Sequence, residues 1–236
     1  MFVRTRPIVA IDGPAGAGKS TVARRLADAL GYVLVDTGAM YRVVALAAQR
    51  AKVDWSDGAQ LAVLARGLVA QNALAFERDP GLGIRVKLTQ GGKCEDVSDA
   101  IRTPDMAHGA STVSAHPQVR SVLLELQRLA GRSGGVVLEG RDIGTVVFPD
   151  AEVKFFLTAS ADVRASRRHA ELVAKDAAVT LAETLADVKR RDAQDEGRAV
   201  APLKRADHAI LVDSTDLTFE ETVAKMLADV KRIAYA

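Results

Sequence analysis

The chain has 236 residues, of which 48% are hydrophobic and 26% are charged. This composition is ordinary for a globular protein and excludes a disordered or fibrous chain, and the length suits one α/β domain with a small insertion. Lys and Arg number 32 against 30 Asp and Glu, so the net charge is +2. Such a small charge argues against a protein that attracts nucleic acid or an anionic membrane through its overall field.

The sequence also bears on the compartment. The single cysteine, Cys94, allows no internal disulfide and no cysteine-based zinc site. The apolar stretch that ends at Asp12 is too short for a secretory signal, and no later run approaches the roughly 20 apolar residues that span a bilayer. We therefore expect a cytoplasmic protein without a membrane anchor.

Short β-type runs alternate along the chain with longer stretches of helical period. This alternation is typical of a parallel sheet covered by helices on both faces. The expected sheet strands are short and apolar on both sides, as buried parallel strands are, and they span Ile8–Ile11, Tyr32–Val35, Val136–Glu139, Val153–Leu157 and Ala209–Val212. The expected fold class is α/β, with a five-stranded parallel sheet flanked by helices.

A glycine-rich turn follows the first expected strand and opens the first helix. It fits the pattern G-x-x-x-x-G-K-[ST] in the strand and helix context that the pattern requires, and it consists of Gly13, Pro14, Ala15, Gly16, Ala17, Gly18, Lys19 and Ser20, followed by Thr21. The backbone N–H groups of this phosphate cradle (Gly13–Ser20) can point at phosphates, Lys19 can reach the β- and γ-phosphates, and Ser20 can offer a hydroxyl to Mg²⁺. The turn therefore predicts a nucleoside triphosphate site, in preference to a merely tight glycine turn. Motors, switches and kinases share this feature, so it does not choose among them.

Between residues 73 and 97 the pattern changes to three short β-type stretches. They span Ala73–Glu77, Ile84–Thr89 and Lys93–Val97, and the turn sequences Asp79-Pro80-Gly81 and Gly91-Gly92 divide them. We expect a small antiparallel β insertion at residues 73–97, within a core domain that covers residues 1–72 and 98–236.

Arginines follow the second and third expected strands. Residues 36–42 read DTGAMYR and residues 139–145 read EGRDIGT. Both segments lie at the carboxyl ends of parallel strands, where open α/β sheets bind ligands. The fork of an arginine suits phosphate oxygens, so Arg42 and Arg141 can hold a second phosphate opposite the γ-phosphate. Either arginine alone would be read as a solvated surface residue, but together, beside glycines at strand ends, they favour an acceptor phosphate.

Two charged stripes at helical spacing come later in the chain: Arg164, Arg167 and Arg168, and then Arg191, Asp195 and Arg198. Either could be an ordinary solvated helix face, or the two could close over phosphates as a helical lid at about residues 160–200. Two helix starts are marked by capping-box sequences, Thr180 with Glu183 and Thr218 with Glu221.

Several stretches of the chain resemble the bacterial cytidylate kinases, the CMP/dCMP kinases among the P-loop nucleoside monophosphate kinases. They run in order over nearly the whole chain and read IDGPAGAGKST, VDTGAMYR, VSDAIRTPDMAHGASTVSAHPQVR, LEGRDIGTVVFPDA, KRRDAQDEGRAVAPL and ILVDST. The resemblance implies an adenylate-kinase type of fold and ATP-dependent phosphorylation of CMP, and of dCMP, with Mg²⁺, in pyrimidine nucleotide metabolism. It also implies that residues 73–97 belong to the monophosphate-binding side. We expect ATP and CMP or dCMP as partners, no nucleic acid or membrane partner, and a monomer.

The resemblance assigns roles to individual residues. Those that match cytosine-reading positions are Ser111, Arg120 and Asp142. Those that match the lining of the acceptor phosphate and sugar are Thr37, Tyr41, Arg42 and Arg141, together with Arg191, Asp195 and Arg198. Lys19, Arg191 and Arg198 would be catalytic, and the lid residues Arg164, Arg167 and Arg168 would lie near ATP.

Two positions depart from the residues more common in the family. Thr37 stands in place of Ser and keeps a hydroxyl, and Glu139 stands in place of Asp and keeps a charge. A metal contact through Glu139 would need a different geometry, and Asp36 is a further candidate for the surroundings of Mg²⁺. The acceptor phosphate is largely ionised near neutral pH because its second pKa is about 6, so no general base is expected.

Two alternatives remain at this point, a kinase with another acceptor and an RNA-binding protein. A kinase of the same fold could act on UMP or on another small anion. A guanine-nucleotide switch would be expected to carry an Asn-Lys-x-Asp motif, which the sequence lacks. A nucleotide-dependent RNA-binding protein would rely on aromatic stacking and a basic groove, and an aromatic content of 4% speaks against it.

Overall fold

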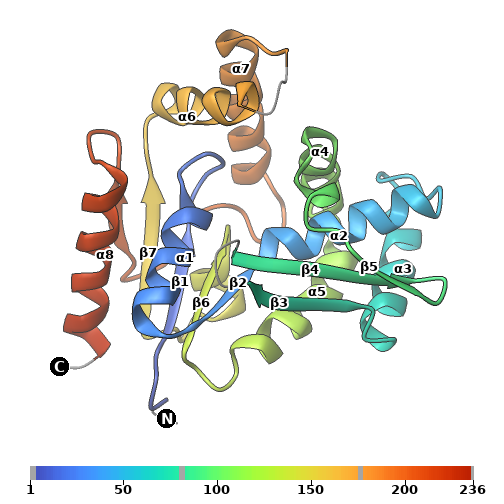
Figure 1. Cartoon of the computed structure of the whole chain (residues 1–236), viewed down its shortest axis with the longest axis horizontal. Coiled ribbons are helices and arrows are strands. Elements are labelled where there is room, and N and C mark those ends of the chain that lie inside the picture. The colour runs from blue at the N-terminus through green and yellow to red at the C-terminus, as the bar shows by residue number, and fades with distance from the viewer. Residues whose placement is uncertain (1–3, 80–82, 175–177, 235–236) are drawn as a thin grey trace. The chain divides into compact units, whose positions relative to one another are not determined.

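The computed structural model describes residues 4–79, 83–174 and 178–234, and Figure 1 shows the course of the chain. The chain divides into two compact units. Unit 1 consists of Met1–Val33 and Ser133–Ala236, and unit 2 consists of Leu34–Arg132. The proposed division into a core and an insertion at residues 73–97 remains a prediction.

A five-stranded sheet has the strand order β2-β6-β1-β7-β8. Its strands are β1 (Ile8–Asp12), β2 (Val33–Asp36), β6 (Val136–Gly140), β7 (Val153–Thr158) and β8 (Ile210–Asp213). The central strand β1 pairs in parallel with β6 and β7, and β7 pairs in parallel with β8. All five residues of β1 are buried, as a strand between two others and under helices on its faces should be. The predicted α/β fold with five strands is confirmed.

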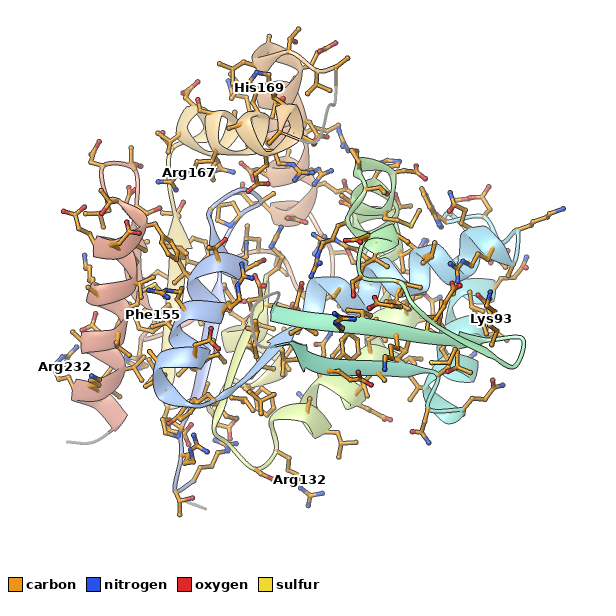
Figure 2. All side chains as sticks on the ribbon, in the orientation of Figure 1. Lys93, Arg132, Phe155, Arg167, His169 and Arg232 are labelled. Atoms are coloured by element: carbon orange, nitrogen blue, oxygen red, sulfur yellow. The ribbon has the colours of Figure 1, made fainter. Side chains whose placement is uncertain are left out.

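Helices α1 (Lys19–Leu30) and α8 (Phe219–Ala234) of unit 1 pack against this sheet. The described part of unit 1 contains the further helices α6 (Ala161–Val173) and α7 (Leu181–Glu196), with a short π-helical turn η2 (Ile143–Val147) after β6. Figure 1 shows α8 beside β7, and α6 and α7 packed against each other beyond the end of β7. Phe155 of β7, labelled in Figure 2, belongs to the hydrophobic core, and its exposed fraction is 1%. The predicted capping boxes at Thr180 and Thr218 both form, each with a reciprocal hydrogen bond to the glutamate three residues on.

Unit 2 contains helices and a second, smaller sheet. Its helices are α2 (Thr37–Arg50), α3 (Gly58–Ala70), α4 (Pro104–Val113) and α5 (Pro117–Gly131), with a 3₁₀ turn η1 (Ala100–Arg102) before α4. α2 packs against α4, and α3 packs against α5. The three strands β3 (Leu74–Asp79), β4 (Gly83–Gln90) and β5 (Lys93–Asp96) are antiparallel, as the sequence predicts.

The turns of the smaller sheet are described in part. Gly91 and Gly92 have φ of 60° and 78°, a left-handed conformation that glycine adopts without strain, so the predicted turn between β4 and β5 is present. Of the predicted turn Asp79-Pro80-Gly81, Asp79 ends β3, and Pro80 and Gly81 lie outside the described residues. Within the described part of the chain, no helix combines the length and the apolar character needed to cross a bilayer.

Candidate active site

The phosphate cradle connects β1 to α1 in unit 1, as the sequence predicts. Gly13 has φ of 153°, and a Cβ there would lie 1.9 Å from the carbonyl oxygen of Leu157 in β7, so only glycine fits at this position. Gly18 has φ of 84° and is the N-cap of α1. The cradle therefore ends at a helix N-terminus, whose N–H groups and dipole favour anions.

Lys19 is the first residue of α1, and its side chain is buried. Its Nζ donates a hydrogen bond to the carbonyl oxygen of Pro14 at 2.7 Å. Burial lowers the pKa of Lys19 to about 7 and the charge of Arg141 lowers it as well, while Glu139 is the strongest of the nearby carboxylates that oppose this. A phosphate placed in the cradle would favour the charged form of this ammonium.

Ser20 and Glu139 lie within hydrogen-bond distance of each other. Ser20 Oγ donates to Glu139 Oε2 at 2.9 Å, because β1 and β6 are neighbours and Glu139 faces Ile11 in the register. A hydroxyl and a carboxylate are oxygen ligands of the kind that Mg²⁺ prefers. Residues 4–79, 83–174 and 178–234 hold no group of three or more His, Cys, Asp or Glu side chains placed to bind a metal. This pair therefore suits an ion that takes most of its ligands from water and phosphates.

Asp12 is a site residue that the sequence analysis does not single out. It ends β1, is 2% exposed, and accepts hydrogen bonds from the backbone N–H groups of Ile143 at 2.7 Å and Gly144 at 2.8 Å. Its carboxylate thereby ties the start of the cradle to the segment that follows Asp142. An acidic residue at the end of an apolar strand was the only signal in the sequence, because its partners lie about 130 residues further along the chain.

Replacing Asp12 by Asn should change how stability depends on pH. Burial, followed by the charge of Asp142, raises the pKa of Asp12 from 3.8 to about 6, against the N–H groups of Gly144 and Ile143 and the charge of Lys19. A carboxyl group with a raised pKa stabilises the fold while it is protonated. The free energy of unfolding of wild-type protein therefore falls as Asp12 ionises between about pH 4 and pH 6. The free energy of unfolding of Asp12→Asn, minus that of wild type, should rise over this window by up to about 3 kcal/mol. Urea unfolding of both proteins at several pH values measures it, and a constant difference would contradict the prediction.

Arg141, Asp195 and Arg198 form an ionic cluster within unit 1. Arg141 Nε lies 2.7 Å from Asp195 Oδ2, and Arg198 binds the other carboxylate oxygen. Burial pushes the pKa of Asp195 upward, but Arg141 and Arg198 together hold it below its usual value. The structure thus brings together three residues of the predicted acceptor site that come from the β6–η2 connection, α7 and the segment after α7.

The remaining arginines of the two predicted stripes have specific partners as well. Arg164 is buried and forms an ion pair with Asp192 at 2.7 Å. Arg167, labelled on α6 in Figure 2, donates to Ser214 Oγ at 3.1 Å and to its carbonyl oxygen at 2.8 Å. Arg191 pairs with Asp187 on its own helix at 2.9 Å.

Arg168 is partly exposed, with a side chain that is 28% accessible and an ion pair to Glu171 at 3.0 Å. The stripe is therefore not a uniformly solvated helix face, since Arg164 and Arg167 point to partners in other elements. Residues 175–177 of the predicted lid lie outside the described residues.

Unit 2 holds the other half of the predicted acceptor residues. Thr37 begins α2, where the side chain of Asp36 caps the helix by accepting from the N–H of Ala39 at 2.9 Å. On the next turn Tyr41 is buried, and the guanidinium carbon of Arg120 lies 5.7 Å from the centre of its ring. Arg120, on α5, also donates to the carbonyl oxygen of Ser114 at 3.2 Å.

Arg42 follows Tyr41 on α2 and is partly exposed, and Ser111 is partly exposed on α4. The predicted acceptor set therefore divides evenly between the units. Unit 2 holds Thr37, Tyr41, Arg42, Ser111 and Arg120, and unit 1 holds Arg141, Asp142, Arg191, Asp195 and Arg198.

Comparison with known proteins identifies the family of the chain. A family model described as cytidylate kinase matches residues 9–232. Cytidylate kinases from Geobacter sulfurreducens and Geobacter sp. strain M21 are 56% and 57% identical to this chain over 219 and 224 residues. These matches cover 93% and 95% of the chain and 90% and 92% of the relatives. A third cytidylate kinase, from Citrifermentans bemidjiense, is 55% identical over 224 residues, which are 95% of the chain and 92% of that protein.

The match with the family model includes the whole cradle, the β6–η2 connection and α7. The chain belongs to the cytidylate kinase family.

Proposed function

We propose that this chain transfers the γ-phosphoryl group of ATP to CMP, and also to dCMP, as a nucleoside monophosphate kinase. The observation that carries this proposal is membership of the cytidylate kinase family together with a phosphate cradle whose Lys19 is buried in the turn. An oxygen of the acceptor phosphate attacks the γ-phosphorus, the bond to the bridging β–γ oxygen breaks, and ADP leaves with that electron pair. The products are ADP and CDP.

The donor side of the site consists of residues of unit 1. The N–H groups of the cradle would hold the phosphates of ATP, and Lys19 would neutralise charge that develops on the transferred group. Arg167 and Arg168 of α6 would lie near the nucleotide. The lid at about residues 160–200 would limit the access of water, so that ATP is not simply hydrolysed.

Mg²⁺ is the metal that the donor oxygens suit. Ser20 Oγ and Glu139 Oε2, 2.9 Å apart, would be its protein contacts, and Asp36 would influence it from further away. When bound, the ion would neutralise charge on the phosphates. The four histidines take no part in the proposed reaction, since the ionised acceptor phosphate needs no general base.

Each unit contains residues that we propose for the acceptor. In unit 1, Asp195 holds Arg141 and Arg198 in fixed positions through ion pairs, so these two guanidinium groups are ready to bind the acceptor phosphate. Asp195 has a second capacity, since a carboxylate can accept hydrogen bonds from the hydroxyl groups of a sugar. In unit 2, the hydroxyls of Thr37 and Tyr41 and the charge of Arg42 would complete the contacts to phosphate and ribose.

The base would be read by Ser111, Arg120 and Asp142. Cytosine carries an amino group where uracil carries a carbonyl oxygen, and an ionised carboxylate can only accept hydrogen bonds. Asp142 would therefore bind the exocyclic amine of cytosine. Facing uracil, it would leave two acceptors opposed, at a cost of roughly 1–3 kcal/mol. The closest alternative function, a kinase of the same fold that prefers UMP, would lack this discrimination.

The Asp142→Ala variant should lose most of its activity on CMP and much less on UMP. Wild-type protein should prefer CMP by at least about tenfold in kcat/KM, since 1.4 kcal/mol is a factor of ten, and the variant should narrow this ratio. The measurement is kcat/KM for both acceptors and both proteins at fixed ATP and Mg²⁺.

Asp162→Ala is a matched control, because Asp162 lies in the first turn of α6 and outside the proposed base-reading set. It should leave the CMP to UMP ratio unchanged. If Asp142→Ala lowers both activities equally, Asp142 positions phosphate or metal and does not select the base. ADP release by wild-type protein with CMP, dCMP, UMP and AMP tests the function itself, and release that does not depend on CMP would overturn it.

The compartment and the oligomeric state of the protein follow from the same proposal. We place the reaction in the cytoplasm, where the single thiol, Cys94, would stay reduced on the exposed surface of β5. We further propose that the protein acts as a monomer on small-molecule substrates, without nucleic acid or membrane partners.

A further inference from the structure

Arg164 is buried at the start of α6, and its guanidinium group binds three separate elements of unit 1. Nε donates to the carbonyl oxygen of Ala159, just before the helix, at 2.8 Å. Nη1 donates to the carbonyl oxygen of Ala15 in the phosphate cradle at 3.1 Å. Nη1 and Nη2 also donate to the two carboxylate oxygens of Asp192 in α7, at 3.0 Å and 2.7 Å. This last contact is the bidentate fork that gives arginine ion pairs their fixed geometry.

The backbone of Arg164 also lies against the cradle. A Cβ at Gly16 would come within 3.1 Å of the carbonyl oxygen of Arg164 and within 3.2 Å of its Cβ. Gly16 has φ of 76°, so glycine is required there for conformation as well as for space. The cradle and the first turn of α6 are therefore in direct contact at the residue that carries the fork.

Asp192 occupies a position on α7 that matters for the proposed chemistry. It follows Arg191 directly, and Asp195 is one turn further on, on the same side of the helix. Asp195 is ion-paired with Arg141 and Arg198. α7 is thus attached to the rest of unit 1 at two neighbouring points, one through Asp192 and one through Asp195.

We propose that Arg164 is a positioning residue that, by joining Ala15 of the cradle to Asp192 of α7, sets the place of Arg191 relative to the transferred phosphoryl group. It acts through these two residues and not by binding ATP. Four of the five N–H groups of this guanidinium already donate to protein oxygens, which leaves one for a phosphate. This inference deepens the proposed function and rests on it, because it concerns the alignment of the groups that carry out the transfer.

A double-mutant cycle tests the proposal. Arg164→Gln and Asp192→Asn should each lower kcat for CDP formation by about 10- to 100-fold, since a displacement of about 1 Å at a reacting group costs up to roughly 100-fold. Each should leave the KM for ATP, and the Kd for ATP measured by calorimetry, within about threefold of wild type. The double variant should be no slower than the slower single variant, because both changes break the same link.

Two further variants keep the experiment informative. Arg164→Lys retains the charge but cannot bind both carboxylate oxygens. Its kcat should therefore be nearly as low as that of Arg164→Gln. Arg232→Gln removes an exposed arginine of α8, labelled in Figure 2, that forms an ion pair with Asp229 at 2.8 Å. This control should leave kcat and both KM values unchanged. The double variant leaves no unpaired charge in the protein interior, so it guards against a single variant that fails to fold.

Three results would overturn the proposal. One is a tenfold or larger rise in the Kd for ATP in Arg164→Gln that Asp192→Asn does not share, which would make Arg164 an ATP ligand. The second is a double variant whose loss in kcat is the product of the two single losses. The third is full activity in Arg164→Lys. Failure of the proposed function itself would be seen separately, as the absence of CDP formation by wild-type protein, and thermal unfolding of the same four proteins would still measure whether the two residues are coupled.

Discussion

Lys19→Ala is expected to lower kcat for CDP formation by roughly 10²- to 10³-fold or more, the loss typical of removing one electrostatic contact to a transition state. The side chain of Lys19 lies inside the phosphate cradle, with its Nζ 2.7 Å from the carbonyl oxygen of Pro14. Without this ammonium group, the phosphates would lose the charge that Lys19 brings into the turn and would rely there on backbone N–H groups. Steady-state kinetics with saturating ATP, Mg²⁺ and CMP gives the result.

The stability of Lys19→Ala should stay close to that of wild type, because burial already disfavours the charged form of this lysine. Lys19→Met is the matched variant, since it keeps an unbranched apolar side chain in the space that the lysine stem fills. Both variants should lose activity to a similar degree while their thermal unfolding remains cooperative. Near-normal turnover in either would remove Lys19 from the mechanism.

Arg191→Met is expected to lower kcat by about 10²-fold or more and to change the KM for CMP by only a few fold. The physical reason is that a charge which meets the transferred group mainly in the transition state contributes to kcat and little to binding. Arg191 is held on α7 by an ion pair with Asp187, and its side chain is 18% exposed. Initial rates over a range of CMP concentrations separate the two parameters.

Arg190→Met is the control for this prediction. Arg190 is the neighbouring residue on α7, pairs with the same Asp187, and has a side chain that is 49% exposed. It should have nearly wild-type kinetics, because an exposed ion pair contributes little. A rise in the KM for CMP with unchanged kcat in Arg191→Met would make Arg191 a binding residue and not a catalytic one.

The amino-acid sequence by itself determines the local features of this protein. The five short apolar runs predict the strands of the parallel sheet to within one residue at each end, because buried strands need continuous apolar sequence. The glycines of the cradle predict its left-handed backbone, which a side chain at Gly13 or Gly18 would oppose. The capping boxes at Thr180 and Thr218 are equally local, since both partners lie within four residues.

Only the tertiary structure decides which distant residues meet. Asp12 binds backbone groups near residue 143, and Arg164 binds Ala15 and Asp192, at separations of 149 and 28 residues. No periodicity in the sequence records such contacts, because they depend on which strands are neighbours in the sheet and on how α6 and α7 pack. The sequence presents the stripe at Arg164 as a choice between a solvated helix face and a lid over phosphates. In the folded chain Arg164, the first arginine of this stripe, is buried and forms an ion pair with Asp192 of α7. Neither interpretation of the stripe predicts this ion pair.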